Sequence, residues 1–277
     1  MTGAVFRTAT LDEVARMLEW AAEEGWNPGL DDAKAFYAAD PSGFFVADLN
    51  GQTVAAISVV NHSDDFAFLG LYLCVPEWRG RGIGFGLWRH AIAHAGTRTI
   101  GLDGVSAQEA NYAKSGFILA GRTRRMTGVL PLEKPMFPEA VPEDFDDLAT
   151  LDRFANGVAR DRFMQAWLQG GPNRKTVVLH RNEKVQGFAT VRRCRDGAKV
   201  GPIVAPDADS ALQLLRQATS TLGETVVIVD VPDASTGFAT HLSELDFSEG
   251  FTTARMYRGP RPTQGSGLHA VATLELG

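Results

Sequence analysis

The stretch of sequence that decides the fold is PEWRGRGIGFGLW, residues 76–88, which places four glycines and two arginines between two apolar segments. The run before it, residues 66–76, is typical of a buried strand that ends at a proline, and residues 85–96 after it have the apolar spacing of a helix. Glycines between a strand and a helix let backbone N–H groups converge on an anion, because no side chain blocks the approach. The loop is therefore predicted to hold a phosphate group.

The residues of this loop discriminate between the known phosphate-binding motifs. A P-loop nucleotidase needs a lysine followed by serine or threonine, and the helix here opens as GIGFGLW, with neither a lysine nor a hydroxyl to hold magnesium. The dinucleotide-binding motif G-x-G-x-x-G needs a third glycine. Phe85 stands at that position if the motif starts at Gly80, and Leu87 stands there if it starts at Gly82. The pattern that fits is Arg-x-x-Gly-x-Gly, formed here by Arg79, Gly80, Arg81, Gly82, Ile83 and Gly84.

Length and composition set the broad class of the protein. A chain of 277 residues suits two domains, and 44% apolar with 22% charged residues is an ordinary globular composition. No apolar run approaches the roughly 18 residues of a membrane span, and the N-terminus has no signal-peptide pattern, so we expect a cytoplasmic protein with no membrane partner. The net charge of −6 argues against a nucleic-acid partner.

The cysteines and histidines predict neither a disulfide framework nor a metal site. Cys74 and Cys194 lie far apart in the sequence and form no CxxC cluster. His90 and His94 have a helical spacing that could bind zinc, but no third ligand lies nearby in the sequence. Two solvated helix histidines are the better interpretation, and no metal is expected.

The first half of the chain alternates between strands and helices. We expect strands at residues 4–10, 66–76, 99–105 and 117–128, and helices at residues 11–25, 31–40, 85–96 and 107–116. Residues 43–62 read as a hairpin around the Asn50-Gly51 turn. Hairpins followed by a strand–helix–strand crossover imply a mixed sheet with helices on its faces, so the predicted fold class is α/β, of the α+β mixed-sheet kind.

The second half repeats the pattern of the first. Four prolines in residues 128–145 mark a linker, after which helices, a hairpin and a strand–helix–strand unit follow again. LDGV before SGFILAGRTRRM in the first half aligns with VDVP before LDFSEGFTTARM in the second, so that Arg125 and Arg255 occupy matching places. We infer two tandem copies of one fold, about 130 residues apart, with two unrelated α/β domains as the alternative.

Three features in this order carry a resemblance to a known family. The segment YLCVPEWRGRGIGFGLW and the later ANYAKSGF resemble the GNAT superfamily, the acetyl-CoA-dependent N-acetyltransferases. The resemblance implies that the loop wraps the pyrophosphate of coenzyme A, with acetyl-CoA as co-substrate. The second half has VGPIVAPDADSALQLL in place of the loop, where Asp207 and Asp209 would repel a pyrophosphate.

The resemblance therefore implies two unequal domains. Residues 1–130 are expected to form a GNAT domain that binds acetyl-CoA. Residues 131–277 are expected to form a degenerate GNAT-like domain that lacks the pyrophosphate loop and ends in a strand such as LHAVATLELG. Tandem proteins of this kind form a bacterial subgroup, which the chain resembles along nearly its whole length.

The resemblance also implies roles for individual residues. Tyr112 matches the acid that protonates the departing thiolate, and a phenol can donate a hydrogen bond there. Asn111 stands beside it, whereas the family has its usual asparagine at a place near Val105. The residues expected to bind the cofactor are Leu73, Cys74, Arg79, Gly80, Arg81, Gly82, Ile83, Gly84 and Asn111.

The base that takes the proton from an acceptor amine is harder to place. Many relatives carry a carboxylate on the strand before the glycine loop, but FAFLGLYLC has none. Asp103 is the leading candidate, because a carboxylate at a strand terminus facing a cleft can act on a bound water. The alternative is that Asp103 caps the helix beginning near Ser106; Glu109 and His62 are weaker candidates for the base.

The favoured function is transfer of an acetyl group from acetyl-CoA to a primary amine of a small molecule or a peptide. An acyltransferase with another donor or acceptor is one alternative, and a non-catalytic acyl-CoA sensor or assembly module is the other. The first helices cover the acceptor in the family, so Trp20, Trp26 and Phe36 are candidates for its lining, with core packing as the alternative. Assembly as a homodimer is left open.

Overall fold

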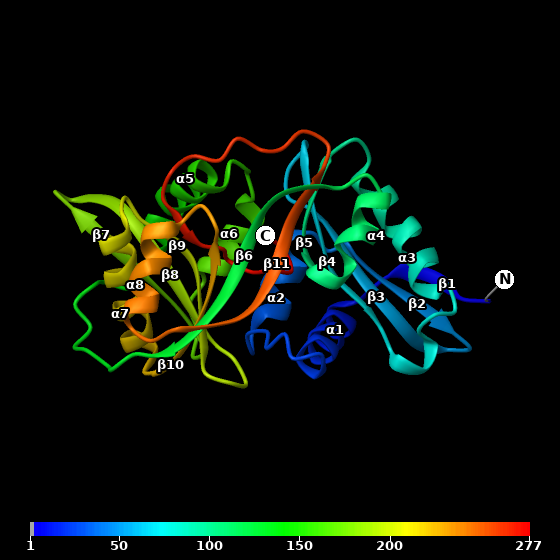
Figure 1. Ribbon diagram of the computed structural model, residues 1–277, viewed down its shortest axis with the longest axis horizontal. Coiled ribbons are helices and arrows are strands. Elements are labelled where there is room, and N and C mark those ends of the chain that lie inside the picture. Colours follow the sequence, from blue (N-terminus) through cyan, green and yellow to red (C-terminus); the bar gives the residue numbers. More distant parts are fainter. Residues whose placement is uncertain (1–2) are drawn as a thin grey trace.

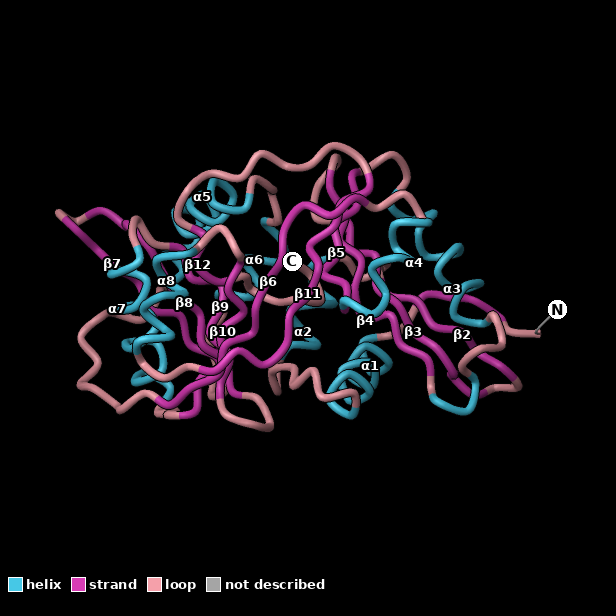
Figure 2. Tube along the Cα trace, in the orientation of Figure 1, coloured by secondary structure: helices cyan, strands magenta, loops and turns pink. Residues whose placement is uncertain are grey.

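Residues 3–277 are described by a computed structural model, in which twelve strands form one continuous mixed sheet (Figures 1 and 2). The N-terminal half contains β1 (Val5–Thr8), α1 (Leu11–Glu23), α2 (Asp32–Ala39), β2 (Phe44–Leu49), β3 (Gln52–Asn61), β4 (Phe66–Cys74), α3 (Ile83–Ile92), β5 (Thr99–Val105), α4 (Glu109–Lys114) and β6 (Ile118–Val129). The C-terminal half contains α5 (Phe145–Asn156), α6 (Asp161–Leu168), β7 (Arg174–Arg181), β8 (Lys184–Arg193), β9 (Ala198–Val204), α7 (Ala208–Leu222), β10 (Val226–Pro232), α8 (Thr236–Glu244), β11 (Ser248–Arg258) and β12 (Leu268–Ala270).

The two halves have the same order of elements. The order α1-α2-β2-β3-β4-α3-β5-α4-β6 is repeated as α5-α6-β7-β8-β9-α7-β10-α8-β11. The predicted α/β class with a mixed sheet is confirmed. Within the described residues, no helix has both the length and the apolar character needed to cross a membrane.

Local sequence signals explain where the elements of the first half begin and turn. Thr10 caps α1 by accepting a hydrogen bond from the N–H of Glu13, whose carboxylate accepts one from the N–H of Thr10 in return. Asn50 and Gly51 both have a positive φ, as a two-residue hairpin turn requires, and they join β2 to β3 as expected.

Alternate residues of the strands serve two cores on opposite faces of the N-terminal sheet. Phe44 and Val46 of β2 pack with α1 and α2, in a core that extends to α5 and α6 of the second half. Phe45 and Ala47 pack on the other face with α3. The period of two along the strands therefore fixes which helices cover which face.

The strand order shows that the two halves exchange their last long strands. The middle of the sheet runs β4-β5-β11-β6-β10-β9, so β11 of the second half pairs with β5, and β6 of the first half pairs with β10. Figure 1 shows β6 and β11 side by side at the centre of the molecule, between the two halves. The predicted division into domains of residues 1–130 and 131–277 stays a prediction. In the structure, the last long strand of each half pairs with a strand of the other half.

Each exchanged strand carries an arginine that pairs with a buried aspartate of the other half. Arg255 lies opposite Asp103 in the β11–β5 register, and its guanidinium donates to both carboxylate oxygens at 2.9 and 2.6 Å. Arg125 lies opposite Asp230 in the β6–β10 register and makes the equivalent pair at 2.8 and 2.9 Å. The two arginines that match in the repeat alignment therefore form two equivalent ion pairs, and each pair joins one half of the chain to the other.

The end of the chain differs from the expected strand over residues 268–277. Only β12 pairs, with β9, and the remaining residues form a buried tail without regular structure. A Cβ atom added to Gly201 would lie 2.0 Å from the carbonyl oxygen of Val271, and one added to Gly70 would lie 2.0 Å from that of Glu275. The tail thus passes from β9 in one half to β4 in the other, where glycines leave room for its backbone.

The buried ion pair of β6 and β10 predicts a large stability difference between two arginine substitutions. Arg125→Met leaves the Asp230 carboxylate buried without its partner, so we expect the free energy of unfolding in urea to fall by about 3 kcal/mol. Arg153→Met removes an equally close pair with Asp161 that is more than half exposed, and should cost less than about 1 kcal/mol. Equal losses in the two variants would contradict the structural role of the buried pair.

Candidate active site

A cavity opens where β4 and β5 diverge. The two strands are paired in parallel only from Phe66 to Leu69 and from Thr99 to Leu102. Beyond this point lies a cavity of about 560 Å³, which reaches the glycine loop. Its lining includes Leu69, Leu71, Tyr72, Leu73, Cys74, Trp78, Arg79, Gly80, Gly82, Gly84, Asp103, Tyr112, Trp26, Arg125, Phe251, Thr253, Leu274 and Glu275.

The glycine loop has the backbone geometry of an anion cradle. Gly80 and Gly82 have φ values of 74° and 80°, and a Cβ atom added to either would meet no atom within 4 Å. Gly82 is the N-cap of α3 and has no side chain to satisfy the first N–H groups of the helix. These N–H groups and the positive end of the helix dipole are therefore available to a negatively charged ligand at the edge of the cavity.

The two loop arginines hold the loop in place. Arg79 donates through Nε to the carbonyl oxygen of Cys74 at 2.8 Å and forms an ion pair with Glu24, just after α1. The Arg81 guanidinium lies over the Trp78 ring, 4.6 Å from its centroid. Arg79 lines the cavity, whereas Arg81 does not. The loop is thereby tied both to the end of β4 and to the first helix.

Tyr112 is directed toward the cavity from α4. Its ring stacks on Trp88, with centroids 5.8 Å apart, and fills the space beside Gly104, where a Cβ atom would lie 2.2 Å from the ring. Burial raises the pKa of Tyr112 to about 12, and the nearby Tyr72 hydroxyl acts in the same direction. The phenol is therefore protonated at neutral pH and can donate a hydrogen bond.

Asp103 lies at the cavity, but its carboxylate is already engaged. Both oxygens accept hydrogen bonds from Arg255, and the Asp103 side chain is fully buried. The helix beyond β5 receives no side-chain cap, so the alternative role of Asp103 as its cap is wrong. The sequence could not have revealed the partner, because Arg255 is brought to β5 by the strand exchange.

The other predicted site residues divide into those at the cavity and those away from it. Of the expected cofactor ligands, Ile83 is a fully buried core residue, and the Asn111 amide donates to Gln108 Oε1 at 2.7 Å. Neither lines the cavity. Glu109 pairs with Arg122 and is also outside the lining.

Trp26 is the only one of the three predicted acceptor-site aromatics that lines the cavity. Phe36 is buried against Trp167, and Trp20 packs at the edge of the same core.

His94 pairs with Asp40, while His90 packs against Phe45. Within residues 3–277, no group of three or more histidine, cysteine or acidic side chains is arranged to hold a metal ion.

Several cavity residues were not identified from the sequence. Phe251 and Thr253 come from the exchanged strand β11, Arg125 comes from β6, and Leu274 and Glu275 come from the C-terminal tail. The repeat alignment singled out Arg125 and Arg255 as a matching pair, but no local pattern indicated that the tail or the exchanged strands reach this cavity.

The equivalent place in the second half is closed by the chain itself. β9 and β10 are paired in parallel over only three residues, and β12 then pairs with β9 while the N–H of Val271 donates to the carbonyl of Asp230. In the second half, the tail therefore fills the gap that corresponds to the cavity of the first half. Asp207 caps α7 by accepting from the N–H of Ser210 at 2.7 Å, so its own carboxylate sits where a phosphate would bind.

Comparisons with known proteins agree with this geometry. The family model described as Acetyltransferase (GNAT) family matches residues 11–117, and a second, described as Acetyltransferase (GNAT) domain, matches residues 148–268. The holothin acyltransferase of Pseudoalteromonas sp. (strain SANK 73390) is 34% identical over 277 residues, which cover 98% of this chain and 94% of the relative. The chain belongs to the GNAT acyltransferase family.

Solved structures support the same GNAT fold over the whole chain. A putative acetyltransferase from Pyrococcus horikoshii is 21% identical and has a TM-score of 0.80, with coverage of 100% of this chain and 97% of the other. A tandem GNAT protein from the clavulanic acid biosynthesis pathway is 17% identical, with a TM-score of 0.63 and coverage of 93% and 99%. The predicted tandem GNAT fold and the enzyme class, an acyltransferase, are confirmed.

His62, a weaker candidate for the base, lies outside the cavity lining and predicts a pH effect on stability instead. Burial lowers its pKa to about 4, with the charge of Arg160 acting in the same direction, and its Nε2 lies 2.8 Å from the carbonyl oxygen of Leu276. The unfolded chain binds a proton on this imidazole near pH 6.5, but the folded protein binds one only near pH 4. Lowering the pH through this range therefore destabilises the fold.

We expect His62→Gln to remove this pH dependence while keeping an amide donor for Leu276. Between pH 6.5 and 4, the wild-type protein should lose about 3 kcal/mol of unfolding free energy more than the variant does, measured by urea denaturation. His180→Gln, at an exposed position of β7, is the control and should keep the wild-type dependence. Parallel pH profiles for wild type and His62→Gln would contradict the prediction.

Proposed function

We propose that the protein transfers an acetyl group from acetyl-CoA to a primary amine of a small molecule or a peptide. The observation that carries the proposal is that the glycine loop and Tyr112 border one cavity, between strands that diverge beside it. An anion cradle at one edge and a protonated phenol at the wall match two separate parts of the donor, its pyrophosphate and its thioester. The reacting amine would enter from the side formed by the second half.

The residues present fit the pyrophosphate of coenzyme A. Open space next to Gly80 and Gly82, together with the uncapped N-terminus of α3, offers backbone N–H donors without a competing side chain. Gly84 faces the Tyr72 hydroxyl, which would lie 2.8 Å from a Cβ atom at that position. A side chain at Gly84 would therefore disturb the wall of the cavity. When bound, acetyl-CoA supplies the activated acyl group.

Tyr112 is our candidate for the acid. The departing thiolate has a pKa near 8.5 if it behaves as an ordinary thiol, and a phenol of higher pKa stabilises it mainly by donating a hydrogen bond. Asp103 has a different role in this proposal. Because its carboxylate holds Arg255 in a bidentate pair, we infer that it positions β11 beside the cavity and does not act as the base.

The acceptor side of the cavity favours an amine with an apolar, flat body. Trp26 and Phe251 line it, and the Phe251 ring lies 5.0 Å from the Arg125 guanidinium. The relative from Pseudoalteromonas is named a holothin acyltransferase, so holothin is one acceptor to test. The cytoplasmic location expected from the sequence, and a homodimer, remain proposals.

A longer acyl-CoA is a second candidate donor. The relative's name specifies acyl and not acetyl transfer, and leucine side chains from β4, β5 and the tail line the cavity. Propionyl-CoA and hexanoyl-CoA, compared with acetyl-CoA under the same conditions, would rank the donors by kcat/KM.

The first test is calorimetric binding of acetyl-CoA, followed by thiol release with benzylamine, tryptamine and spermidine as acceptors. Gly82→Ala places a methyl group in the open space of the cradle, at a φ of 80°, and should raise the Kd for acetyl-CoA at least about tenfold. Gly223→Ala introduces the same kind of strain at a φ of 75° after α7, and should bind as the wild type does. Absence of wild-type binding at millimolar acetyl-CoA would overturn the proposal.

The acid role predicts a specific kinetic defect. Tyr112→Phe should lower kcat about 100-fold with the Kd for acetyl-CoA unchanged, because the ring remains stacked on Trp88 while the donor to the thiolate is lost. Tyr37→Phe removes a hydroxyl from α2, outside the cavity lining, and should leave kcat unchanged. Full turnover by Tyr112→Phe would remove the assignment.

A further inference from the structure

Three carboxylates line the cavity, and two of them are already paired. Glu24 forms an ion pair with Arg79, and Asp103 forms one with Arg255. Glu275, in the C-terminal tail, is only 4% exposed, and among residues 3–277 its carboxylate has no hydrogen-bond or salt-bridge partner. Within the described residues, neither of its oxygens is a fully buried atom without a partner, so the carboxylate keeps access to the cavity, where a ligand can meet it. The free carboxylate of this cavity is therefore Glu275.

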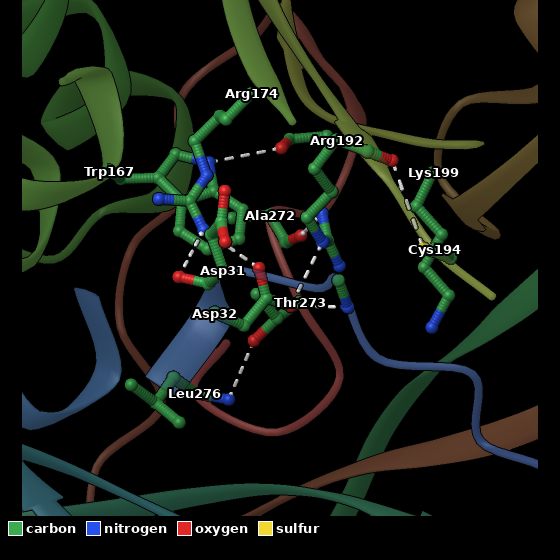
Figure 3. A network of polar contacts seen from close by, with 12 residues as sticks. Asp31, Asp32, Trp167, Arg174, Arg192, Cys194, Lys199, Ala272, Thr273 and Leu276 are labelled. Atoms are coloured by element: carbon green, nitrogen blue, oxygen red, sulfur yellow. Dashed lines mark hydrogen bonds and ion pairs between the residues drawn. The ribbon is translucent and has the colours of Figure 1, made fainter. Parts of the chain in front are cut away.

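The tail holds Glu275 between anchored neighbours. On one side, Arg192 donates to the carbonyl oxygen of Ala272 at 2.8 Å. On the other, the N–H of Leu276 donates to Thr273 Oγ1 at 2.8 Å, and the Leu276 carbonyl contacts His62. Figure 3 shows Arg192, Ala272, Thr273 and Leu276 in one polar network with Asp32.

This network is deeply buried and is joined by ion pairs. Asp32 pairs with Arg174 at 2.8 Å and with Arg192 at 3.1 Å, and both guanidiniums lie over the Trp167 ring. Because the network joins α2 of the first half to β7 and β8 of the second, it fixes the tail relative to both. Glu275 is thus presented at the cavity by a tail segment that is anchored to this buried, ion-paired network.

The charge of Glu275 acts on two nearby cations, Lys199 and Arg125, without a direct ion pair to either. Burial and the positive charge of Arg125 lower the pKa of Lys199, while Glu275 and Asp230 oppose this shift. Lys199 donates to the carbonyl oxygen of Trp26 at 2.7 Å, and Arg125 is held by Asp230. The other titratable groups that line the cavity with Glu275 are Glu24, Tyr72, Cys74, Arg79, Asp103 and Tyr112.

We propose, building on the acyl-transfer function above, that Glu275 binds the ammonium group of the acceptor and takes up its proton. An alkylammonium has a pKa of about 10.4, so it must lose a proton before its nitrogen can attack. The carboxylate becomes a carboxylic acid as the ammonium becomes an amine. The proton then leaves Glu275 for solvent.

The remaining steps balance without any further reactant. The amine nitrogen forms a bond to the thioester carbon, and the second proton lost by that nitrogen passes to the Glu275 carboxylate. The carbon–sulfur bond breaks as the amide forms, and the departing thiolate accepts a hydrogen bond from Tyr112 and takes a proton from solvent. Glu275 then releases its second proton to solvent. In sum, one ammonium and one thioester give one amide, one thiol and one proton.

The experiment compares the full-length wild type with Glu275→Gln. The variant should bind acetyl-CoA within twofold of the wild type and keep its thermal midpoint, but lose about 100-fold in kcat/KM for benzylamine. The wild-type rate should fall toward acidic pH, and this fall should be absent from the pH profile of Glu275→Gln. Glu275→Asp retains a shorter carboxylate, and should recover part of the rate together with that pH dependence. Glu143→Gln, at an exposed position before α5, is the control and should match the wild type.

A second readout does not depend on turnover. Benzylamine binding to the coenzyme A-loaded protein, measured by calorimetry, should weaken at least about tenfold in Glu275→Gln. If the wild type binds acetyl-CoA but releases no thiol, the proposed function fails while this comparison still tests the Glu275 site. Equal benzylamine binding by both proteins, binding by neither, or Glu275→Gln turnover within threefold of the wild type would each overturn the assignment.

Discussion

Arg125 and Arg255 each cross from one half of the chain to a buried aspartate of the other, and the arrangement of the sheet depends on these two bidentate contacts. Each pair joins strands that lie directly opposite one another in an antiparallel register. A buried charge that lost its partner would be strongly destabilising, so the exchanged pairing of β6 with β10 and of β11 with β5 is favoured over misaligned alternatives. The two repeats therefore fold into one continuous sheet.

The exchange changes what surrounds the cavity beside β4 and β5. β11 brings Phe251 and Thr253 to its wall, and the tail that follows brings Leu274 and Glu275. A GNAT domain built from the first half alone would lack all four residues. The second half thus contributes to the site of the first, although its own glycine loop is absent and its own gap is filled by β12.

The C-terminal tail fills the gap between β9 and β10 in the second half and lines the cavity beside β4 and β5 in the first half. The backbone of the tail packs closely on Gly201 of β9 and on Gly70 of β4, which are corresponding strands of the two halves. Neither position has room for a side chain. Asp207 occupies the start of α7 in the second half, whereas Gly82 leaves the start of α3 open in the first. Small differences at equivalent positions therefore separate a binding site from a structural copy.

The sequence by itself determined the elements, the repeat and the glycine loop, because each depends on residues close together in the chain: the Asn50-Gly51 turn, the helix after Gly82, the periodicity of the strands. Only the tertiary structure decided which half each last strand joins. The two copies share one pattern, so β6 and β11 suit either partner locally, and the choice rests on long-range contacts. For the same reason Asp103 looked like a free carboxylate, and Glu275, which is distant in sequence from the loop, gave no local signal of its place in the cavity.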